Sequence, residues 1–310
     1  MDSLIFEACL DNAHYLLGLV INGLIIGAIY ALMAIGLTLI FSVLGIVSFA
    51  HGEFYMIGGF VAYFLLEYFT AMHWVPAILI AGLATFILGA VFEQGFLKPM
   101  FSGRVERPGE YAILVTFGLA FFLQYLTLAI VGPFPVKADR YVNVDIPRLL
   151  GRITIPSTRV VAATVAILSI AGLAYFLQRT WTGRALRAVS QDKDAAAVTG
   201  INPQRMNRMA FGIGCMLAGI AGATLVQVFS WVFDVGVVAS AKSFVIIVLG
   251  GMGSVPGALF GGLIIGVVEA LGTGCFPDPN RSLAYRDAFG LIIFALILLF
   301  RPQGFFGRKL

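Results

Sequence analysis

Long apolar runs separated by short polar connections dominate this chain. A helix that crosses the hydrocarbon core of a bilayer needs about 20 apolar residues, and most of these runs reach or approach that length. We therefore predict an all-α integral membrane protein, a polytopic helix bundle of about eight apolar segments. The predicted segments are residues 16–41, 45–66, 75–97, 111–131, 160–177, 206–229, 242–272 and 288–300.

The composition supports one membrane domain. The chain is 60% hydrophobic and 12% charged, whereas about 25% of residues are charged in soluble domains. No polar connection approaches the roughly 40 residues that a small self-folding domain needs. Acidic residues precede the first apolar run, which is the reverse of a secretory signal, so we expect no cleaved leader. We predict a single transmembrane domain over residues 1–310.

The most polar stretch of the chain covers residues 178–206 and reads QRTWTGRALRAVSQDKDAAAVTGINPQRM. Its arginines, lysine and aspartates cannot lie in hydrocarbon and must sit in water. The simplest interpretation is a charged loop that marks the cytoplasmic side. The alternative is a helical segment outside the bilayer that transmits a push from a soluble partner into the membrane.

Local signals favour the helical alternative. Thr182 can cap a helix from Gly183 to Thr199, and Gly200 can end that helix through a positive φ. Asn202 and Pro203 then form a cap and first helical residue, so the next helix begins at a fixed angle and enters the membrane.

Small side chains fall on one face of this predicted helix. In a continuous helix, Ala185, Ala188, Val189 and Ala196 lie within an arc of roughly 100°, which would let another surface approach closely. Asp192 projects into the same arc. A break near residues 190–192, which gives two short helices, is therefore the alternative.

The distribution of basic residues predicts the orientation. No basic residue precedes the first apolar run, whereas Arg301, Arg308 and Lys309 follow the last one. The N-terminus is thus expected outside and the C-terminus inside. Eight simple crossings would put both ends on one side, so one segment must be broken, re-entrant or miscounted.

The best candidate for that segment is 242–272, because its 31 residues would extend about 46 Å as one helix. Its middle reads LGGMGSVPGALFGG, and interrupted backbone at membrane depth is tolerated only beside a cavity or within protein. A simple bend between two spans is the alternative. The residues of this interruption that are predicted to line a pathway are Gly250, Gly251, Gly253, Pro256 and Gly257.

The predicted outer loop, residues 132–159, departs from the positive-inside tendency. Either the orientation is wrong, or these cations meet an acidic partner. The basic residues of this loop are Lys137, Arg140, Arg148, Arg152 and Arg159.

Small residues also recur at the spacing of helix packing. Such rows let helices in lipid approach backbone to backbone, but they do not decide between packing within this chain and packing against a second one. The rows are Gly23, Gly27 and Ala31; Gly257 and Gly261; Gly262 and Gly266; and Ala218 and Gly222.

Ionisable residues close to apolar runs are further candidates for a pathway. His51 and Glu53 begin the second apolar segment, and Glu269 lies near the end of the interrupted one. Because His51 and Glu53 are two residues apart, they point to different faces of a helix and make a weak metal site. A structural role, in which they bond backbone or a neighbouring helix, is the alternative.

No enzyme signature is present. The chain has no Gly-Lys dipeptide, which excludes a phosphate-binding GxxxxGK[ST] loop, and it has no GxSxG or HExxH motif. Its three cysteines imply neither a disulfide framework nor a metal site. A bridge between Cys9 and Cys275 is not expected. Without a run of four basic residues, nucleic-acid binding is not indicated. We expect no catalytic residue, cofactor or metal on this chain.

Four stretches resemble the permease subunits of bacterial branched-chain amino acid ABC importers of the Liv type. They are GLTLIFSVLGIVSFAHGEFYMIGGF, TWTGRALRAVSQDKDAAAVTGIN, SFVIIVLGGMGSVPGALFGGLIIGVVEALG and LLFRPQGFFGR, in the expected order over nearly the whole chain. The similarity is greatest to the shorter of the two paired permeases and least over residues 132–159.

The resemblance implies a multi-pass protein of the bacterial inner membrane whose 183–200 region docks on an ATPase. The implied partners are a second permease of the same family, two ABC ATPase subunits, an extracytoplasmic substrate-binding protein and membrane lipid. Related systems carry urea or short-chain amides, and an ion-coupled secondary carrier is a competing class. The implied coupling residues are Gly183, Arg184, Ala185, Leu186, Arg187, Ala188, Gly200 and Pro203.

Overall fold

Helices build the described part of the chain in the computed structural model, which covers residues 13–69, 72–103, 105–138, 156–276, 279–282, 284–301 and 303–307. The only β-bridge among these residues joins Val136 and Trp231. The helices are α2 (Ala13–Leu44), α3 (His51–Tyr68), α4 (Trp74–Phe92), α5 (Pro108–Val131), α6 (Ser157–Arg179), α7 (Trp181–Gln191), α8 (Lys193–Val198), α9 (Pro203–Leu225), α10 (Val235–Gly250), α11 (Val255–Gly274), α12 (Pro279–Ser282) and α13 (Arg286–Phe300). A π-helical turn, η1 (Glu93–Leu97), and a 3-10 turn, η2 (Lys98–Ser102), extend α4.

Six helices in the described ranges are long and apolar enough to cross a membrane, and they confirm the all-α polytopic fold. They are Ala13–Leu44, Trp74–Phe101, Pro108–Val131, Ser157–Arg179, Pro203–Leu225 and Val255–Gly274. The shorter helices α3, α10 and α13 make up the rest of the predicted apolar segments.

The interruption predicted within residues 242–272 is confirmed. Helix α10 ends at Gly250, and Gly251 and Gly253 turn the chain at φ values of 94° and 87° before α11 begins. Only glycine adopts such values without strain. A second interruption was not predicted. Residues 45–50, which we assigned to the second apolar segment, are not helical, and Gly45 begins them with a φ of 76°.

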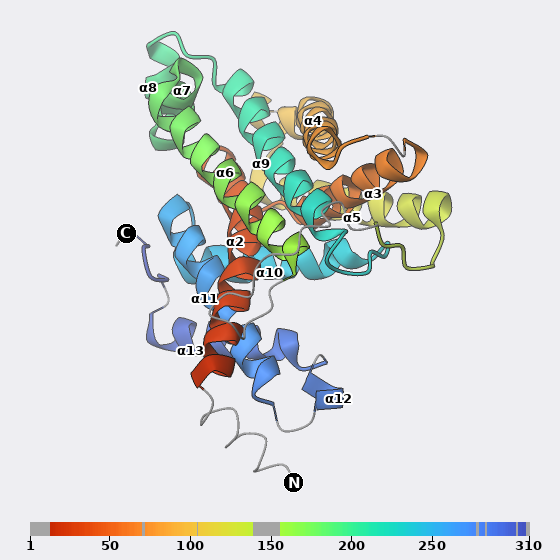
Figure 1. The fold of residues 1–310 in the computed structure, drawn as a ribbon. Helices are drawn as coiled ribbons and strands as arrows, with labels where there is room; N and C mark the ends of the chain where they lie inside the picture. Colours follow the sequence, from red (N-terminus) through yellow and green to blue (C-terminus); the bar gives the residue numbers. More distant parts are fainter. Residues whose placement is uncertain are drawn as a thin grey trace.

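Helices α2 and α9 form the centre of the bundle (Figure 1). In each, 83% of the most apolar window is buried, against 6% in α5, so α5 presents its surface to lipid or to another protein. Helix α2 packs against α11 in antiparallel fashion, since a Cβ on Gly23 would meet Val267 and one on Gly27 would meet Leu263. Two of the predicted rows, Gly23, Gly27 and Ala31 on α2 and Gly262 and Gly266 on α11, thus pack against each other within this chain.

The two ends of the bundle hold different parts of the chain. At one end, Lys193 of α8 reaches the last carbonyl of α2, and Gly253 lies beside Phe41. At the other end, the Tyr15 hydroxyl donates a hydrogen bond to the carbonyl of Gly274. The start of α2 and the α7–α8 segment therefore lie at opposite ends, as the predicted orientation requires (Figure 1).

The structure describes one of the two cysteines that we expected to stay unbridged, and only the ends of the predicted basic loop. Cys275 is disulfide-bonded, which corrects the expectation of no disulfide, and Cys9 lies outside the described residues. Residues 139–155, and with them most of the predicted basic outer loop, are also outside those residues. Arg159 at the base of this loop donates a hydrogen bond to the side chain of Asn22 at 3.0 Å, so it helps to hold α6 against α2.

Candidate functional site

Side-chain caps divide the polar segment 178–206 into elements. Helix α7 is capped by Thr180, whose Oγ1 accepts a hydrogen bond from the backbone N–H of Gly183 at 3.0 Å, so the cap predicted at Thr182 was wrong by two residues. The predicted alternative of two short helices is confirmed. Asp192 separates them and accepts hydrogen bonds from the N–H groups of Asp194 and Ala195 at 2.9 and 3.0 Å.

The entry into α9 follows the prediction. Gly200 has a φ of 87° after α8 ends, and the Asn202 side chain accepts a hydrogen bond from the N–H of Arg205 at 3.1 Å. Pro203 is the first residue of α9. The link between α8 and α9 is therefore short and fixed by backbone geometry at each step.

The small-residue face of this segment packs into the chain itself. Ala185, Leu186, Val189 and Ala196 are buried in the bundle. Gly183 lies so close to α6 that a Cβ would come within 2.5 Å of the Cα of Leu177. These residues of the face join α7 and α8 to their own bundle, and the predicted coupling role of the segment stays a prediction.

Lys193 adds a polar anchor to this packing. Its ammonium donates a hydrogen bond to the carbonyl of Leu44 at 3.1 Å and lies 4.8 Å from the centre of the Phe101 ring. A cation is favourable at the C-terminus of a helix, here α2. Burial lowers the pKa of Lys193 below its ordinary value.

The opposite face of α7–α8 is exposed. Arg184 and Arg187 point away from the bundle, and Ala188 between them is half-buried. Two large apolar side chains are also exposed, Trp181 at 64% and Val198 at 90%. An exposed valine at the tip of a polar segment is a candidate contact for a partner. Neither residue was predicted as a contact from the sequence, although each interrupts a polar run.

A second polar centre lies where α3 begins inside the bundle. Nε2 of His51 lies 2.9 Å from the carbonyl of Met33, which is well inside the length of α2. His51 is fully buried, and this bond matches its structural interpretation. Glu53 points elsewhere, toward α10, where a Cβ on Gly236 would come within 2.5 Å of Oε2 of Glu53.

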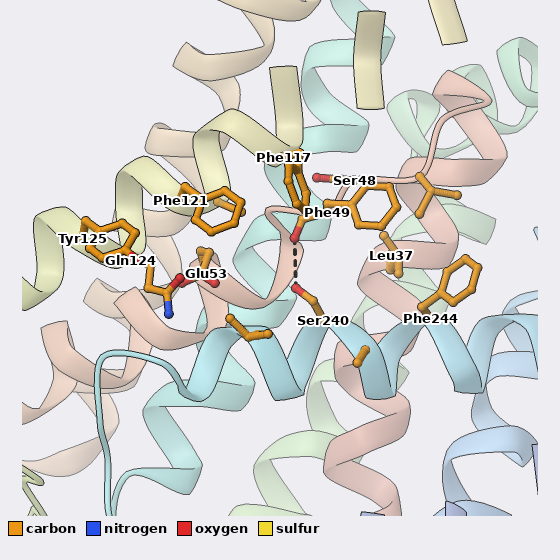
Figure 2. A pocket seen from close by; sticks show the side chains of 14 residues that line it. Leu37, Ser48, Phe49, Glu53, Phe117, Phe121, Gln124, Tyr125, Ser240 and Phe244 are labelled. Atoms are coloured by element: carbon orange, nitrogen blue, oxygen red, sulfur yellow. Dashed lines mark hydrogen bonds between the residues drawn. The ribbon is translucent and has the colours of Figure 1, made fainter. Parts of the chain in front are cut away.

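Glu53 lines a cavity of about 650 Å³ between α3, α5 and α10 (Figure 2). The cavity is mostly apolar, with rings from Phe117 and Phe121 on α5 and from Phe244 on α10. Its polar side chains include Ser48, Glu53, Gln124 and Ser240.

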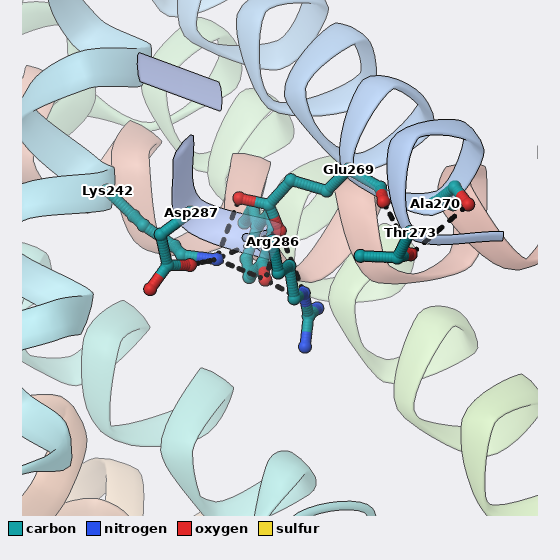
Figure 3. Close-up of polar contacts among 7 residues, drawn as sticks. Lys242, Glu269, Ala270, Thr273, Arg286 and Asp287 are labelled. Carbon is teal, nitrogen blue, oxygen red and sulfur yellow. Dashed lines mark hydrogen bonds and ion pairs between the residues drawn. The ribbon is translucent and has the colours of Figure 1, made fainter. Parts of the chain in front are cut away.

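A third centre is an ion cluster that joins four helices (Figure 3). Glu269 of α11 is 2.7 Å from the ammonium of Lys242 on α10 and 3.0 Å from Nε of Arg286 on α13. The Tyr30 hydroxyl of α2 donates a hydrogen bond to Glu269 at 3.0 Å and accepts one from Arg286 at 2.8 Å. Asp287 pairs with Lys242 at 2.9 Å. Glu269 therefore sits in a satisfied network.

The glycine-rich turn occupies a different place. Gly250 and Gly257 pack against each other, and the N–H groups of Phe305 and Phe306 donate hydrogen bonds to the carbonyls of Leu249 and Gly250 at 2.9 and 3.0 Å. Gly250, Gly251, Gly253, Pro256 and Gly257 line neither the cavity beside Glu53 nor a second one beside the ion cluster, which is bordered by Tyr30, Lys242 and Arg286. Their role in a pathway stays a prediction, as does that of His51, Glu53 and Glu269.

Comparison with known proteins matches residues 19–300 to the family described as "Branched-chain amino acid transport system / permease component". The chain is 34% identical to the high-affinity branched-chain amino acid transport system permease protein BraD of Pseudomonas aeruginosa, over 95% of this chain and 96% of that protein. It is 31% identical to LivH of Escherichia coli K12, with the same coverage. Its identity to LivM of the same strain is 28%, over 89% of this chain and 67% of LivM.

No solved structure matches the chain. Among the described residues, no group of three His, Cys, Asp or Glu side chains could hold a metal ion. The match over nearly the whole chain and the polytopic helical fold lead to one conclusion: this protein belongs to the family of permease components of branched-chain amino acid transport systems.

Proposed function

We propose that this chain is the permease subunit of an ATP-driven importer for branched-chain amino acids. In this proposal it forms the translocation pathway with a second permease, and separate subunits hydrolyse ATP. The names of its relatives support the substrate class, and the similarity to both LivH and LivM supports a pair of permeases. The structural observation that carries the proposal is the α7–α8 segment, buried on one face and exposed on the other.

The packing of this segment suits it to transmit force. Its inner face contacts α6, α2 and α9, and the short link through Pro203 joins it to the start of α9. Because α9 lies mostly in the core, a displacement of α7–α8 cannot be absorbed at the surface and tilts the central helices. Tightly packed interfaces switch between discrete arrangements, so a small shift can change which side a pathway faces.

Different surfaces of this chain contact the proposed partners. ATPase subunits dock on the exposed face that carries Trp181, Arg184, Arg187 and Val198. The exposed surface of α5 is available to lipid or to the second permease. An extracytoplasmic binding protein delivers the amino acid to the opposite end of the bundle. This chain supplies no cofactor site and no catalytic group in this mechanism.

A charge at the tip of α8 tests the docking face. We expect Val198→Asp to lower both co-purification of the ATPase subunits and ATP-driven leucine uptake at least fivefold, because an apolar contact would become a buried charge. Val198 is 90% exposed, so membrane insertion should be unaffected. A matched control is Phe134→Asp, which alters a 79% exposed residue just after the C-terminal end of α5. This variant should keep the ATPase bound. Normal ATPase binding and uptake in Val198→Asp would count against this docking face.

The energy source separates this proposal from an ion-coupled carrier. Leucine uptake into proteoliposomes should require internal ATP and persist when an ionophore collapses the ion gradients. Uptake that stops with the ionophore and continues without ATP would favour the secondary carrier instead.

A further inference from the structure

The cavity beside α5 has the size and lining of a small-molecule site. Its volume of about 650 Å³ lies within the usual range for ligand pockets, which are mostly apolar with a few placed polar groups. It lies where the non-helical residues 45–50 lead into α3, alongside the first half of α10 (Figure 2). Interrupted backbone inside a membrane bundle is tolerated beside a cavity or within protein. Residues 45–50 lie beside this cavity and are packed within the protein.

The acidic group of the cavity has no cationic partner. Glu53 is 1% exposed, and its Oε2 has no hydrogen-bond partner. None of the ion pairs found in the described ranges includes Glu53. The charged residue that acts on it is Asp234, at the start of α10, which repels a second negative charge. A buried carboxylate in this setting is stabilised when a cation arrives from elsewhere.

The other two buried carboxylates show the contrast. Glu269 contacts both Lys242 and Arg286, and Glu93 lies 3.9 Å from Arg208. Both therefore have a cation supplied by this chain, whereas Glu53 has a cavity in that place. The missing charge is one that a ligand can bring.

The rest of the lining suits a ligand that is apolar and carries a second polar group. Gln124 lines the same cavity as Glu53, and the buried Ser48 hydroxyl, which also lines it, has no hydrogen-bond partner (Figure 2). Ser240 is already occupied, because its hydroxyl donates to the carbonyl of Phe49 and accepts from the N–H of Gly52. Gln124 and Ser48 thus keep donors that a ligand can use.

We propose that this cavity binds the transported amino acid itself, with the α-ammonium group against the carboxylate of Glu53. The carboxylate of the ligand then meets the Gln124 amide, and the branched side chain lies among Leu37, Phe117, Phe121 and Phe244. This inference rests on the proposed function and adds the site that recognises the cargo within the permease. It also separates substrates, since urea and short-chain amides carry no cation for Glu53.

The first experiment measures binding with a reporter thiol in the assembled importer. Val237 is 51% exposed at the rim of the cavity, so the Val237→Cys thiol can react with a maleimide, whereas Cys215 is buried and Cys275 is disulfide-bonded. The probes are leucine, 3-methylbutylamine, which keeps only the ammonium group, 4-methylpentanoate, which keeps only the carboxylate, and the neutral 4-methylpentanamide.

We expect saturating leucine and 3-methylbutylamine to slow labelling at least fivefold, and the other two compounds to leave the rate unchanged. Glu53→Gln should remove the protection. The matched control Glu67→Gln alters an exposed carboxylate on the same helix and should keep it. The inference is overturned if 4-methylpentanoate protects the thiol as well as leucine does, or if leucine gives no protection. Both outcomes are measured with Glu53 unaltered.

The second experiment measures transport. We expect Glu53→Gln to lower ATP-driven leucine uptake at least tenfold while the ATPase subunits still co-purify, and Glu53→Asp to restore part of it. Unchanged uptake in Glu53→Gln would overturn the inference and leave the proposed function intact. If the unaltered importer fails to take up leucine with ATP, the proposed function itself is wrong. Should Glu53→Gln fail to fold, the four-compound series on Val237→Cys decides.

Discussion

Loss of the acidic centre of the ion cluster should destabilise the bundle strongly. Glu269 contacts both cations of the cluster, Lys242 and Arg286. The change Glu269→Gln keeps the shape and a hydrogen-bond acceptor for Tyr30, but it removes the negative charge. Lys242 then keeps its ion pair with Asp287, whereas Arg286 loses the ion pair that it makes with Glu269.

The structure sets the size of the effect. Breaking a buried ion pair by removing one partner costs about 3–5 kcal/mol, because an uncompensated buried charge remains. The side chains of Glu269, Lys242 and Arg286 are 3%, 13% and 25% exposed, so solvent screens them little. Asp287 still pairs with Lys242 but is itself 55% exposed. We therefore expect the lower end of the range, a loss of about 3 kcal/mol.

Unfolding in mixed SDS micelles measures this free energy. The control within the cluster is Asp287→Asn, which removes a largely exposed partner and should cost about 1 kcal/mol or less. The control outside it is Arg107→Gln, because Arg107 and Glu110 form an exposed pair, with an expected cost below about 0.5 kcal/mol. If Glu269→Gln costs no more than these two changes, the ion cluster does not stabilise the bundle.

Two further predictions concern packing and capping. Gly262→Ala should cost about 1–3 kcal/mol in the same unfolding assay, because its Cβ would lie 2.6 Å from the Cα of Ala31. The control Gly118→Ala has open space around the new Cβ and should be neutral or stabilising. Equal effects of the two changes would contradict the α2–α11 contact. Asp192→Ala should lower stability by about 1 kcal/mol and reduce leucine uptake per ATP hydrolysed, since two N–H groups lose their acceptor. The control Asp194→Ala should keep normal coupling, and a coupling ratio unchanged in Asp192→Ala would show that the junction does not transmit force.

The amino-acid pattern predicted most helices because membrane length and hydropathy are local properties. It did not predict where helices stop inside the bundle. Residues 45–50 include Ile46, Val47 and Phe49, which are as apolar as the helix that precedes them, and only Gly45 and Ser48 hinted at an interruption. Hydropathy reports the burial of a segment and leaves its backbone conformation open.

The polar segment shows a second limit. The position of Asp192 correctly indicated that the helix is not continuous, and its side chain caps the N-terminus of α8. The periodicity of Ala185 and Val189 correctly identified a contact face, but it could not say whether that face meets this chain or another. For the ion cluster, Glu269 was a candidate from the sequence alone, whereas its contact with Tyr30 spans 239 residues and no local pattern reports it.

The hydrogen bonds of Phe305 and Phe306 to the last turn of α10 have a consequence for biogenesis. The donors for the carbonyls of Leu249 and Gly250 are made more than fifty residues later, as the difference between 249 and 305 shows. During synthesis these two carbonyls accept hydrogen bonds from water or from temporary partners until residues 305 and 306 have left the ribosome. Closure of this corner of the bundle is therefore a late, post-insertional event, and a chain truncated before residue 305 would enter quality control with an unfinished helix end.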